Sequence, residues 1–277
     1  MKPYYQNASV TLYHGDCLEI MPPLAAGSVR GDTSPPHFAA AITDPPFGCT
    51  SCKWDKAPDV ATLQAALRAV CKRNAAKVFF SNIRFAGRLI AADENNFRYD
   101  LVYWKRNPCG ILNARVQPLR SHENILVFYD RKPIYNPQLW QSEPYSKPRR
   151  QINSENYSKH EKNICGEVIA KTKRFPLSVI YHGFSTMTRK QEGAFHPTQK
   201  PVALIEWLVK TYTNEGETII DPFAGSGTAG VAAMRTGRKA VLIELEEKYC
   251  EIAAKRLEAA SRQSLGFAGP RSVAARK

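Results

Sequence analysis

A glycine-rich turn between a buried strand and a helix constrains the fold more than any other feature of this sequence. The strand before the turn ends at Asp221, and a second strand ends at Glu244, 19 positions after Gly225. A carboxylate at the tip of the second strand is placed to accept a ribose hydroxyl in nucleotide-binding α/β folds. The expected elements are a strand at 218–221, the turn at 222–230, a helix body at 231–236 and a strand at 239–244.

The glycines at 225, 227 and 230 match the dinucleotide pattern G-x-G-x-x-G, so a nicotinamide or flavin cofactor is one interpretation. Only 47 residues follow Gly230, too few for the second half of a dinucleotide fold, and the other strands must therefore precede the turn. Asp221 would repel a pyrophosphate, yet it can accept from an ammonium group or a hydroxyl. S-adenosylmethionine has both groups and no phosphate, which favours it as cofactor. A dinucleotide-dependent oxidoreductase stays as the alternative from another class.

Strand and helix patterns alternate on both sides of a less regular central region, which predicts an α/β sheet covered by helices. We expect strands at 9–13, 39–43, 77–81, 99–104 and 124–129, helices at 60–73 and 202–213, and a final helix ending near 260. The boundaries that follow are 1–130 and 196–260 for the two parts of the α/β domain, 131–195 for an insertion and 261–277 for a disordered tail.

The insertion at 131–195 is basic and rich in aromatic residues. It has twelve Lys and Arg against five Glu and no Asp. Cations interleaved with aromatic side chains suit contact with a nucleic-acid backbone and stacking on bases, so we interpret the region as a target-recognition lobe rather than a linker. The residues of this region predicted to contact DNA are Arg149, Arg150, Lys173 and Arg174, and outside it Lys53 and Trp54 are predicted to do so as well.

The net charge of +14 and the pI near 9.5 favour nucleic acid or an anionic membrane surface as a partner. No apolar run approaches the roughly 18 residues of a transmembrane helix, and the N-terminus lacks the apolar segment of a signal peptide. We therefore expect a cytoplasmic protein with no membrane partner. The seven cysteines are scattered, and Cys49 and Cys52 form a C-x-x-C without a second pair of ligands, so we expect reduced thiols and no metal.

A second turn, Asp44-Pro45-Pro46-Phe47, follows the expected strand at 39–43. Its two prolines fix the backbone and remove two donors, so the turn presents rigid carbonyl acceptors. An exocyclic base amine is a poor nucleophile because its lone pair is delocalised into the ring. The Asp44 carboxylate and the Pro45 carbonyl can accept its two N–H bonds and aim the lone pair, and Asp44 can take the proton afterwards. Phe47 can stack on a base extruded from a duplex.

The two turns together resemble the motifs of the β-class DNA amino-methyltransferases, which act on adenine N6 or cytosine N4. Asp44 to Phe47 resembles the catalytic motif and 221–228 the cofactor motif, and the catalytic motif comes first, as in that class. The resemblance covers residues 10–256. Further similar segments are Gly15-Asp16-Cys17, the loop 48–55 with Lys53-Trp54-Asp55, His122-Glu123, 135–138 and 196–201.

The resemblance implies a Rossmann-like S-adenosylmethionine-dependent methyltransferase fold, with a mixed seven-stranded doubly wound sheet and an inserted recognition region. It implies that Asp16 meets the adenine of the cofactor and that Lys200 helps to hold its methionine end. The implied partners are double-stranded DNA, a second copy in a homodimer and a cognate restriction endonuclease. The implied catalytic residues are Asp44, Pro45, Pro46 and Phe47, and the implied cofactor-binding residues are Asp16, Cys17, Asp44, His196, Thr198, Lys200, Asp221, Phe223, Ala224, Gly225, Ser226, Gly227, Thr228 and Glu244.

Phe47 departs from the family pattern, whose commonest residue at this position is Tyr. Phenylalanine keeps the stacking face and loses a hydroxyl, and because the acceptors are Asp44 and Pro45 we expect activity. Asp rather than Ser at the first position resembles adenine-N6 enzymes, so adenine-N6 methylation with base flipping is the expected reaction. Cytosine N4 is the alternative within the class, RNA is a third substrate, and a catalytically inactive DNA-binding protein is the remaining alternative.

Overall fold

The computed structural model describes residues 1–26, 38–50, 52, 55–141, 172–180 and 199–266. They belong to two compact units: a main unit, made of residues 1–136 and those from 178 onward, and a smaller unit within residues 137–177. In these ranges, no helix is both long and apolar enough to cross a bilayer.

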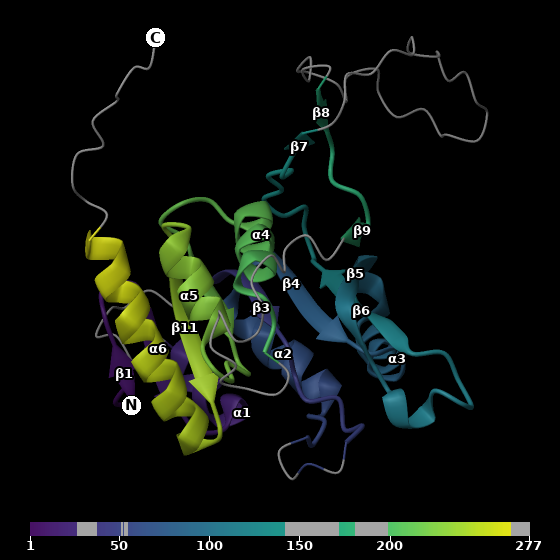
Figure 1. Ribbon diagram of the computed structural model, residues 1–277. Coiled ribbons are helices and arrows are strands. Elements are labelled where there is room, and N and C mark those ends of the chain that lie inside the picture. Colours follow the sequence, from purple (N-terminus) through teal and green to yellow (C-terminus); the bar gives the residue numbers. More distant parts are fainter. Residues whose placement is uncertain (27–37, 51, 53–54, 142–171, 181–198, 267–277) are drawn as a thin grey trace. The chain divides into compact units, whose positions relative to one another are not determined.

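A mixed sheet runs through the main unit in the strand order β1-β2-β11-β10-β3-β4-β6-β5-β9 (Figure 1). The strands from β2 to β4 in this order are parallel, and β6 is antiparallel to both of its neighbours. The predicted mixed sheet of seven strands is confirmed, and the two-residue strands β1 and β9 extend its edges. The bounds are β1 Tyr5–Gln6, β2 Val10–His14, β3 Phe38–Thr43, β4 Cys71–Ser81, β5 Phe97–Cys109, β6 Arg120–Phe128, β9 Val179–Ile180, β10 Thr218–Asp221 and β11 Lys239–Glu244.

Helices cover both faces of this sheet, because its central strands are apolar on both sides. Successive strand residues point to opposite faces, and in β3 Ile42 joins one core cluster while Ala41 joins the other. Ile219 and Ile220 of β10 divide in the same way. The first cluster includes α4 (Val202–Tyr212), α5 (Thr228–Arg235) and α6 (Glu247–Gly266), and the second includes α1 (Cys17–Ala25), α2 (Val60–Val70) and α3 (Ile83–Ala92). The predicted doubly wound arrangement is confirmed.

The C-terminal ends of two helices differ from the sequence-based boundaries by three residues or more. The predicted helix 60–73 is too long, because α2 ends at Val70 and β4 begins at Cys71. Residues 72–74 of that strand are polar and at least partly exposed, and periodicity cannot distinguish them from an exposed helix face. At the other end of the chain, α6 continues to Gly266, past the predicted end near 260, because good helix formers precede that glycine. The rest of the predicted tail, 267–277, lies outside the described residues.

The smaller unit contains a two-stranded antiparallel sheet of β7 (Trp140–Gln141) and β8 (Lys173–Arg174). The indole Nε1 of Trp140 donates to the carbonyl oxygen of Phe175 at 3.1 Å. This unit lies inside the predicted insertion 131–195, but residues 131–136 and 178–180 of that range belong to the main unit, where β9 pairs with β5. Lys173 and Arg174, predicted to contact DNA, both lie on β8.

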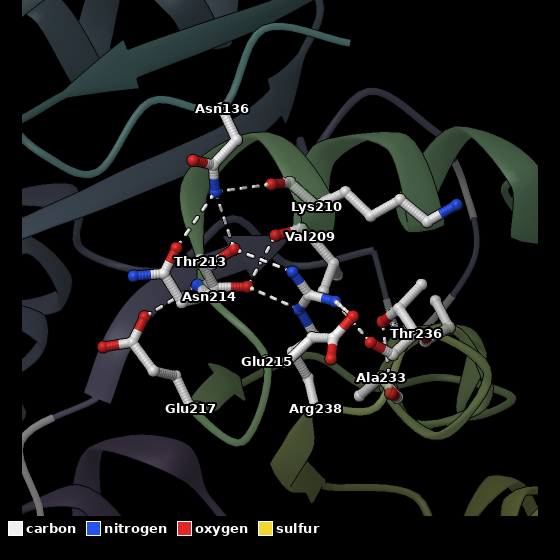
Figure 2. Close-up of polar contacts among 11 residues, drawn as sticks. Asn136, Val209, Lys210, Thr213, Asn214, Glu215, Glu217, Ala233, Thr236 and Arg238 are labelled. Carbon is white, nitrogen blue, oxygen red and sulfur yellow. Dashed lines mark hydrogen bonds and ion pairs between the residues drawn. The ribbon is translucent and has the colours of Figure 1, made fainter.

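A buried arginine organises the end of the main unit where β10 and β11 begin (Figure 2). Arg238 donates from Nη2 to the Thr213 carbonyl at 3.0 Å and from Nη1 to the Thr236 carbonyl. Asn136 donates from Nδ2 to the carbonyls of Lys210 and Thr213 at 3.2 and 3.1 Å. The carbonyls at the end of α4 lack partners within the helix, so these side chains complete its last turn. Asn136, the main-unit residue that precedes the smaller unit in the sequence, is thereby bound to the end of α4.

Arg238→Ala is expected to lower the free energy of unfolding by about 2–4 kcal/mol, because the Thr236 carbonyl loses its side-chain donor and the Thr213 carbonyl keeps only the one from Asn136. Arg235→Ala is the matched control: that side chain is 50% exposed and lies 3.6 Å from Glu206. We expect it to change the free energy of unfolding by less than about 0.5 kcal/mol. Urea denaturation followed by circular dichroism measures both. Equal effects of the two substitutions would contradict the structural role of Arg238.

Candidate active site

The two turns singled out in the sequence meet in one pocket of about 580 Å³ at the edge of the sheet where β3 and β10 end. The two strands are parallel neighbours with Ala41 opposite Ile220, so the residues that follow them emerge side by side. Thr43 Oγ1 donates to Asp221 Oδ1 at 2.8 Å and joins the two strand ends directly. The predicted site residues that line the pocket are Asp16, Cys17, Asp44, Pro45, Pro46, Phe47, Lys200, Asp221, Phe223, Ala224, Gly225, Ser226, Thr228 and Glu244.

The carboxylate of Asp221 is buried near other acidic groups. Burial raises its pKa to about 7, although hydrogen bonds from Thr43 and from the backbone N–H of Phe223 oppose the rise. The charges of Asp44 and Glu244 raise the pKa of Asp221 further. A cation in the pocket would favour the ionised form, so this carboxylate is suited to an ammonium partner.

Glu244, predicted to accept a ribose hydroxyl, also holds the glycine turn. Its Oε2 accepts from the backbone N–H of Gly225 at 2.7 Å, and its Oε1 accepts from that of Glu246 at 2.9 Å. Each carboxylate oxygen has more than one lone pair, so these bonds leave capacity for a ligand hydroxyl. Glu244 therefore both holds the conformation of the glycine turn and lines the pocket.

The three glycines of the turn have different structural roles. Gly225 lines the pocket and has a φ of +52°. Gly227 has a φ of +77°, and a Cβ there would lie 3.1 Å from Ala253 of α6. A Cβ on Gly230 would lie 2.7 Å from Leu257 of the same helix. Gly227, predicted to contact the cofactor, and Gly230 thus allow close packing of α6 behind the pocket.

Two side chains from outside the turn fix its conformation. Arg256 of α6 donates from Nη1 to the carbonyl of Ser226 at 3.2 Å and to Thr228 Oγ1 at 2.8 Å. Ser226 Oγ donates to Gln199 Oε1 at 3.0 Å, which links the turn to the residue before Lys200. Neither Arg256 nor Gln199 is a predicted site residue. Gln199 stands in a segment that resembles the family, whereas the position of Arg256 on a helix carries no motif.

Lys200 connects the proposed catalytic carboxylate to a second acidic residue. Its Nζ lies 2.5 Å from Asp44 Oδ2, 3.2 Å from Glu123 Oε2 and 5.0 Å from the centre of the Phe80 ring. The Lys200 side chain is 11% exposed, and an unpaired charge in such a place costs several kcal/mol. Glu123 is missing from the predicted site, although it lies in the His122-Glu123 pair that resembles the family. The sequence gives no sign that it reaches Lys200.

The charges of these three residues depend on one another. Burial raises the pKa of Asp44, and the nearby Lys200 opposes that rise. Burial also disfavours the charge of Glu123, but Lys200 and Lys105 outweigh it and lower the pKa of Glu123. Burial disfavours the charge of Lys200 as well, but the two carboxylates outweigh it and raise the Lys200 pKa above its ordinary value. Asp44 is therefore a more basic carboxylate than usual, held beside a permanent cation.

Contacts of Phe47 at one end and of Asp55 at the other hold the loop 47–55. The Phe47 ring packs against Phe85 of α3, with 5.5 Å between the ring centres, and also lines the pocket. The Asp55 carboxylate accepts from the three backbone N–H groups of residues 48–50 at 2.6 to 2.9 Å. Burial opposes the charge of Asp55, but these bonds outweigh it and lower its pKa. Asp55 is thus a functional candidate that the sequence placed in a family-like loop without a role.

Several predicted residues cannot be compared with this geometry. His196, Thr198, Lys53, Trp54, Arg149 and Arg150 lie outside the described residues. Lys173 and Arg174 are described, but they belong to the smaller unit. The DNA-contacting roles of all these residues, and the cofactor-binding roles of His196 and Thr198, stay predictions.

Comparison with known families decides between the classes left open by the sequence. The family of N6 and N4 methyltransferases, described as DNA methylase, matches residues 38–255, a range that holds both turns and the pocket. The chain belongs to this DNA methylase family. The expected membership in the β-class DNA amino-methyltransferases is confirmed.

Similar proteins include both short and long matches. The chain is 50% identical over 76 residues to the Type II methyltransferase M2.DpnII of Streptococcus pneumoniae, covering 27% of this chain and 28% of that protein. It is 44% identical over 69 residues to the DNA adenine methyltransferase YhdJ of Escherichia coli strain K12, covering 25% and 24%. The match to the Type II methyltransferase M.ScaI of Streptomyces caespitosus is 25% identical over 276 residues, covering 93% and 84%. The first two matches thus span about a quarter of each relative.

Two solved structures share the fold. The complex of M1.HpyAVI with SAM has a TM-score of 0.57 at 24% identity and covers 90% of this chain and 99% of that one. The cytosine-N4-specific PvuII DNA methyltransferase has a TM-score of 0.64 at 16% identity and covers 94% and 93%. The predicted Rossmann-like methyltransferase fold is confirmed.

Lys200→Met is expected to lower the free energy of unfolding by about 3–5 kcal/mol, because Asp44 and Glu123 lose their shared cation. Adding Glu123→Gln removes one of the two carboxylates that repel each other once Lys200 is gone, and should restore at least about 1 kcal/mol of that loss. Urea denaturation at pH 7 measures each variant. The control is Glu94→Gln, an exposed substitution that should add to Lys200→Met within about 0.5 kcal/mol. If the effects of Lys200→Met and Glu123→Gln on the free energy of unfolding were also additive, Lys200 and Glu123 would not be energetically coupled.

Proposed function

We propose that this protein is a DNA methyltransferase that transfers a methyl group from S-adenosylmethionine to adenine N6 in double-stranded DNA. The observation that carries the proposal is the hydrogen bond between Thr43 and Asp221, which joins the strand before the Asp-Pro-Pro-Phe turn to the strand before the glycine turn. A methyl donor held at one turn and an amine held at the other would therefore share one pocket. Membership in the DNA methylase family supports the same reaction.

The charge of the pocket suits a cationic cofactor without phosphate. Its lining contains seven carboxylates and two ammonium groups, one of which, that of Lys200, is paired with two of the carboxylates. Such a lining repels a pyrophosphate and attracts ammonium and sulfonium groups, which disfavours a dinucleotide cofactor. The carboxylates are those of Asp16, Asp44, Asp55, Glu123, Asp221, Glu244 and Glu246, and the ammonium groups those of Lys56 and Lys200.

Separate residues of the pocket suit separate parts of the cofactor. Asp221, whose raised pKa favours a cationic partner, is the proposed acceptor for the ammonium group. Glu244 at the tip of β11 is the proposed ribose acceptor, and Asp16 at the start of α1 the proposed partner of the adenine. When bound, S-adenosylmethionine supplies a methyl group on a cationic sulfur that leaves as a neutral thioether.

The Asp-Pro-Pro-Phe turn is proposed to orient the substrate amine. Lys200 occupies Oδ2 of Asp44, so the amine would meet the other carboxylate oxygen and the carbonyl of Pro45. The raised pKa of Asp44 suits it to take the proton that the methylated amine sheds. Phe47, braced by Phe85, is the proposed stacking surface for the extruded base.

Adenine in double-stranded DNA is the proposed substrate for two reasons. Asp at position 44 resembles adenine-N6 enzymes, and one relative, YhdJ, is named a DNA adenine methyltransferase. The net charge of +14 suits a polyanion. A homodimer and a cognate restriction endonuclease are further proposed partners, the latter supported by relatives named Type II methyltransferases.

Asp44→Ala is expected to abolish methylation and to leave S-adenosylhomocysteine binding within about threefold of the wild-type value. The reason is that Asp44 is proposed to contact the amine and its proton. Mass analysis of nucleosides from DNA incubated with enzyme and S-adenosylmethionine measures methyladenine and methylcytosine together, and calorimetry measures binding. Asp100→Ala, an exposed aspartate outside the pocket lining, is the matched control. Parallel loss of binding and methylation would assign Asp44 a structural role instead, and N4-methylcytosine as the product would overturn the choice of adenine.

Binding of S-adenosylhomocysteine is expected to release about half a proton at pH 7 and almost none at pH 9. Asp221 has a pKa of about 7 in the free protein, and the ligand ammonium would lower it. Calorimetric titrations in buffers of different ionisation enthalpy count the proton, and Asp221→Asn should release none. The same raised pKa makes the free wild-type protein less stable as the pH rises from 4 to 7, and Asp221→Asn should make this decline smaller. Proton release that persists in Asp221→Asn would point to another group.

A further inference from the structure

The tip of the hairpin formed by β5 and β6 gathers exposed apolar side chains among cations. Ile111, Leu112 and Val116 are 72%, 96% and 82% exposed. The hairpin tip, defined as residues 104–121, contains four Lys or Arg and no acidic residue. Clustered exposed apolar residues on a soluble protein mark an interaction site more often than chance.

The hairpin tip extends from the edge of the sheet that carries the pocket (Figure 1). β6 is antiparallel to β4, and Asn124 pairs with Ser81 at the end of β4, so the residues before Asn124 reach beyond that strand end. Glu123 lines the pocket. Arg120 acts on Cys49, two residues after the Asp-Pro-Pro-Phe turn: partial burial raises the pKa of that thiol, and the charge of Arg120 opposes it. The base of the hairpin tip is thus beside the proposed catalytic turn.

The same geometry gives the reach of the tip. Arg120 pairs with Cys109, and Ile111 and Leu112 lie beyond that pair. A strand rises about 3.3 Å per residue, which places the apolar tip roughly 10–20 Å from Glu123. Base pairs are spaced about 3.4 Å apart along a duplex, so the tip would meet DNA within about six base pairs of a base held in the pocket.

Two partners could cover these apolar side chains, a second copy of this chain or a DNA duplex, and charge complementarity favours the duplex. A second copy of this chain would bring another basic tip, or another part of a protein with a net charge of +14, against the four cations. A DNA duplex brings phosphates for the cations and base steps for the apolar residues. Apolar side chains of this kind act as wedges that partly unstack base steps in other DNA-binding proteins.

We propose that Ile111 and Leu112 form an apolar wedge that enters the duplex beside the target base, while Arg115 and Arg120 contact the flanking phosphates. The wedge stands on a defined turn, with Gly110 at a φ of +90° and a single 3₁₀ turn over Ile111–Asn113. By unstacking a neighbouring step, the wedge lowers the work of extruding the target base. This inference rests on the proposed DNA methyltransferase function.

The first test replaces the wedge by Ile111→Ser with Leu112→Ser. Methylation of genomic DNA from a methylation-free host should fall about tenfold or more in kcat/KM, while the S-adenosylhomocysteine affinity and the melting temperature stay at wild-type values. The matched control, Ile111→Leu with Leu112→Met, keeps apolar side chains and should retain at least half of the activity. Equal activity of the serine and control variants would overturn the wedge.

The second test addresses the cations through DNA binding alone. Fluorescence anisotropy with a labelled duplex at several salt concentrations gives the slope of log K against log salt. Arg115→Ala with Arg120→Ala should reduce the magnitude of this slope by about two, whereas Arg235→Ala should leave it unchanged. An unchanged slope in the hairpin variant would overturn the phosphate contacts.

Sedimentation velocity tests whether a second copy of this chain, rather than DNA, covers the hairpin tip. If the wild-type protein is a dimer that Ile111→Ser with Leu112→Ser dissociates, the tip is an interface between copies and the wedge is wrong. A wild-type protein that methylates no DNA would sink the proposed function, and the anisotropy slopes would still report on the hairpin tip. A wild-type protein that methylates DNA no better than its serine variant would sink the wedge alone.

Discussion

The parallel pairing of β3 with β10 is the constraint on which the candidate site depends. These strands are far apart in the sequence, yet their registered backbones bring the ends of both to one place, where Thr43 bonds to Asp221 across 178 positions of the chain. The pairing is possible because β3 is buried along its whole length, with small Ala side chains at 39–41 that admit helices on both faces. A bulkier or half-exposed strand would separate the two turns. Sheet packing therefore sets the distance between the two halves of the site.

The protein combines an acidic pocket with a basic surface. The lining holds more carboxylates than ammonium groups, although the whole chain carries a net charge of +14. Within the pocket, burial strengthens each interaction, and Lys200 lies between two carboxylates that would otherwise repel each other. Opposite signs at the two places allow a cationic small molecule and an anionic polymer to approach the same centre without competing for the same groups.

Sequence patterns located the strands and the turns but not the side chains that bridge them. β10 and β11 match their expected bounds to the residue, because each is a short apolar run bounded by turn residues. The helix expected to reach 73 ends at Val70, because the polar start of β4 continues a helical-looking pattern. The residues at strand ends, such as Asp44 and Asp221, could be found because topology alone brings strand ends together. Pairs such as Lys200 with Glu123 could not, since they depend on side-chain directions that no periodicity records.

Backbone hydrogen bonds within the main unit hold the two residues, Asn136 and Ser178, that flank the smaller unit in the sequence. Asn136 donates from its backbone N–H to the Thr211 carbonyl at 2.8 Å, and Ser178 accepts from the backbone N–H of Val102 at 2.8 Å. Between two such fixed points, the entropy cost of a longer segment grows slowly, by about 0.6 kcal/mol for each doubling of its length. A change in the length of residues 137–177 should therefore cost the main unit little free energy, and the sheet and its pocket should stay intact.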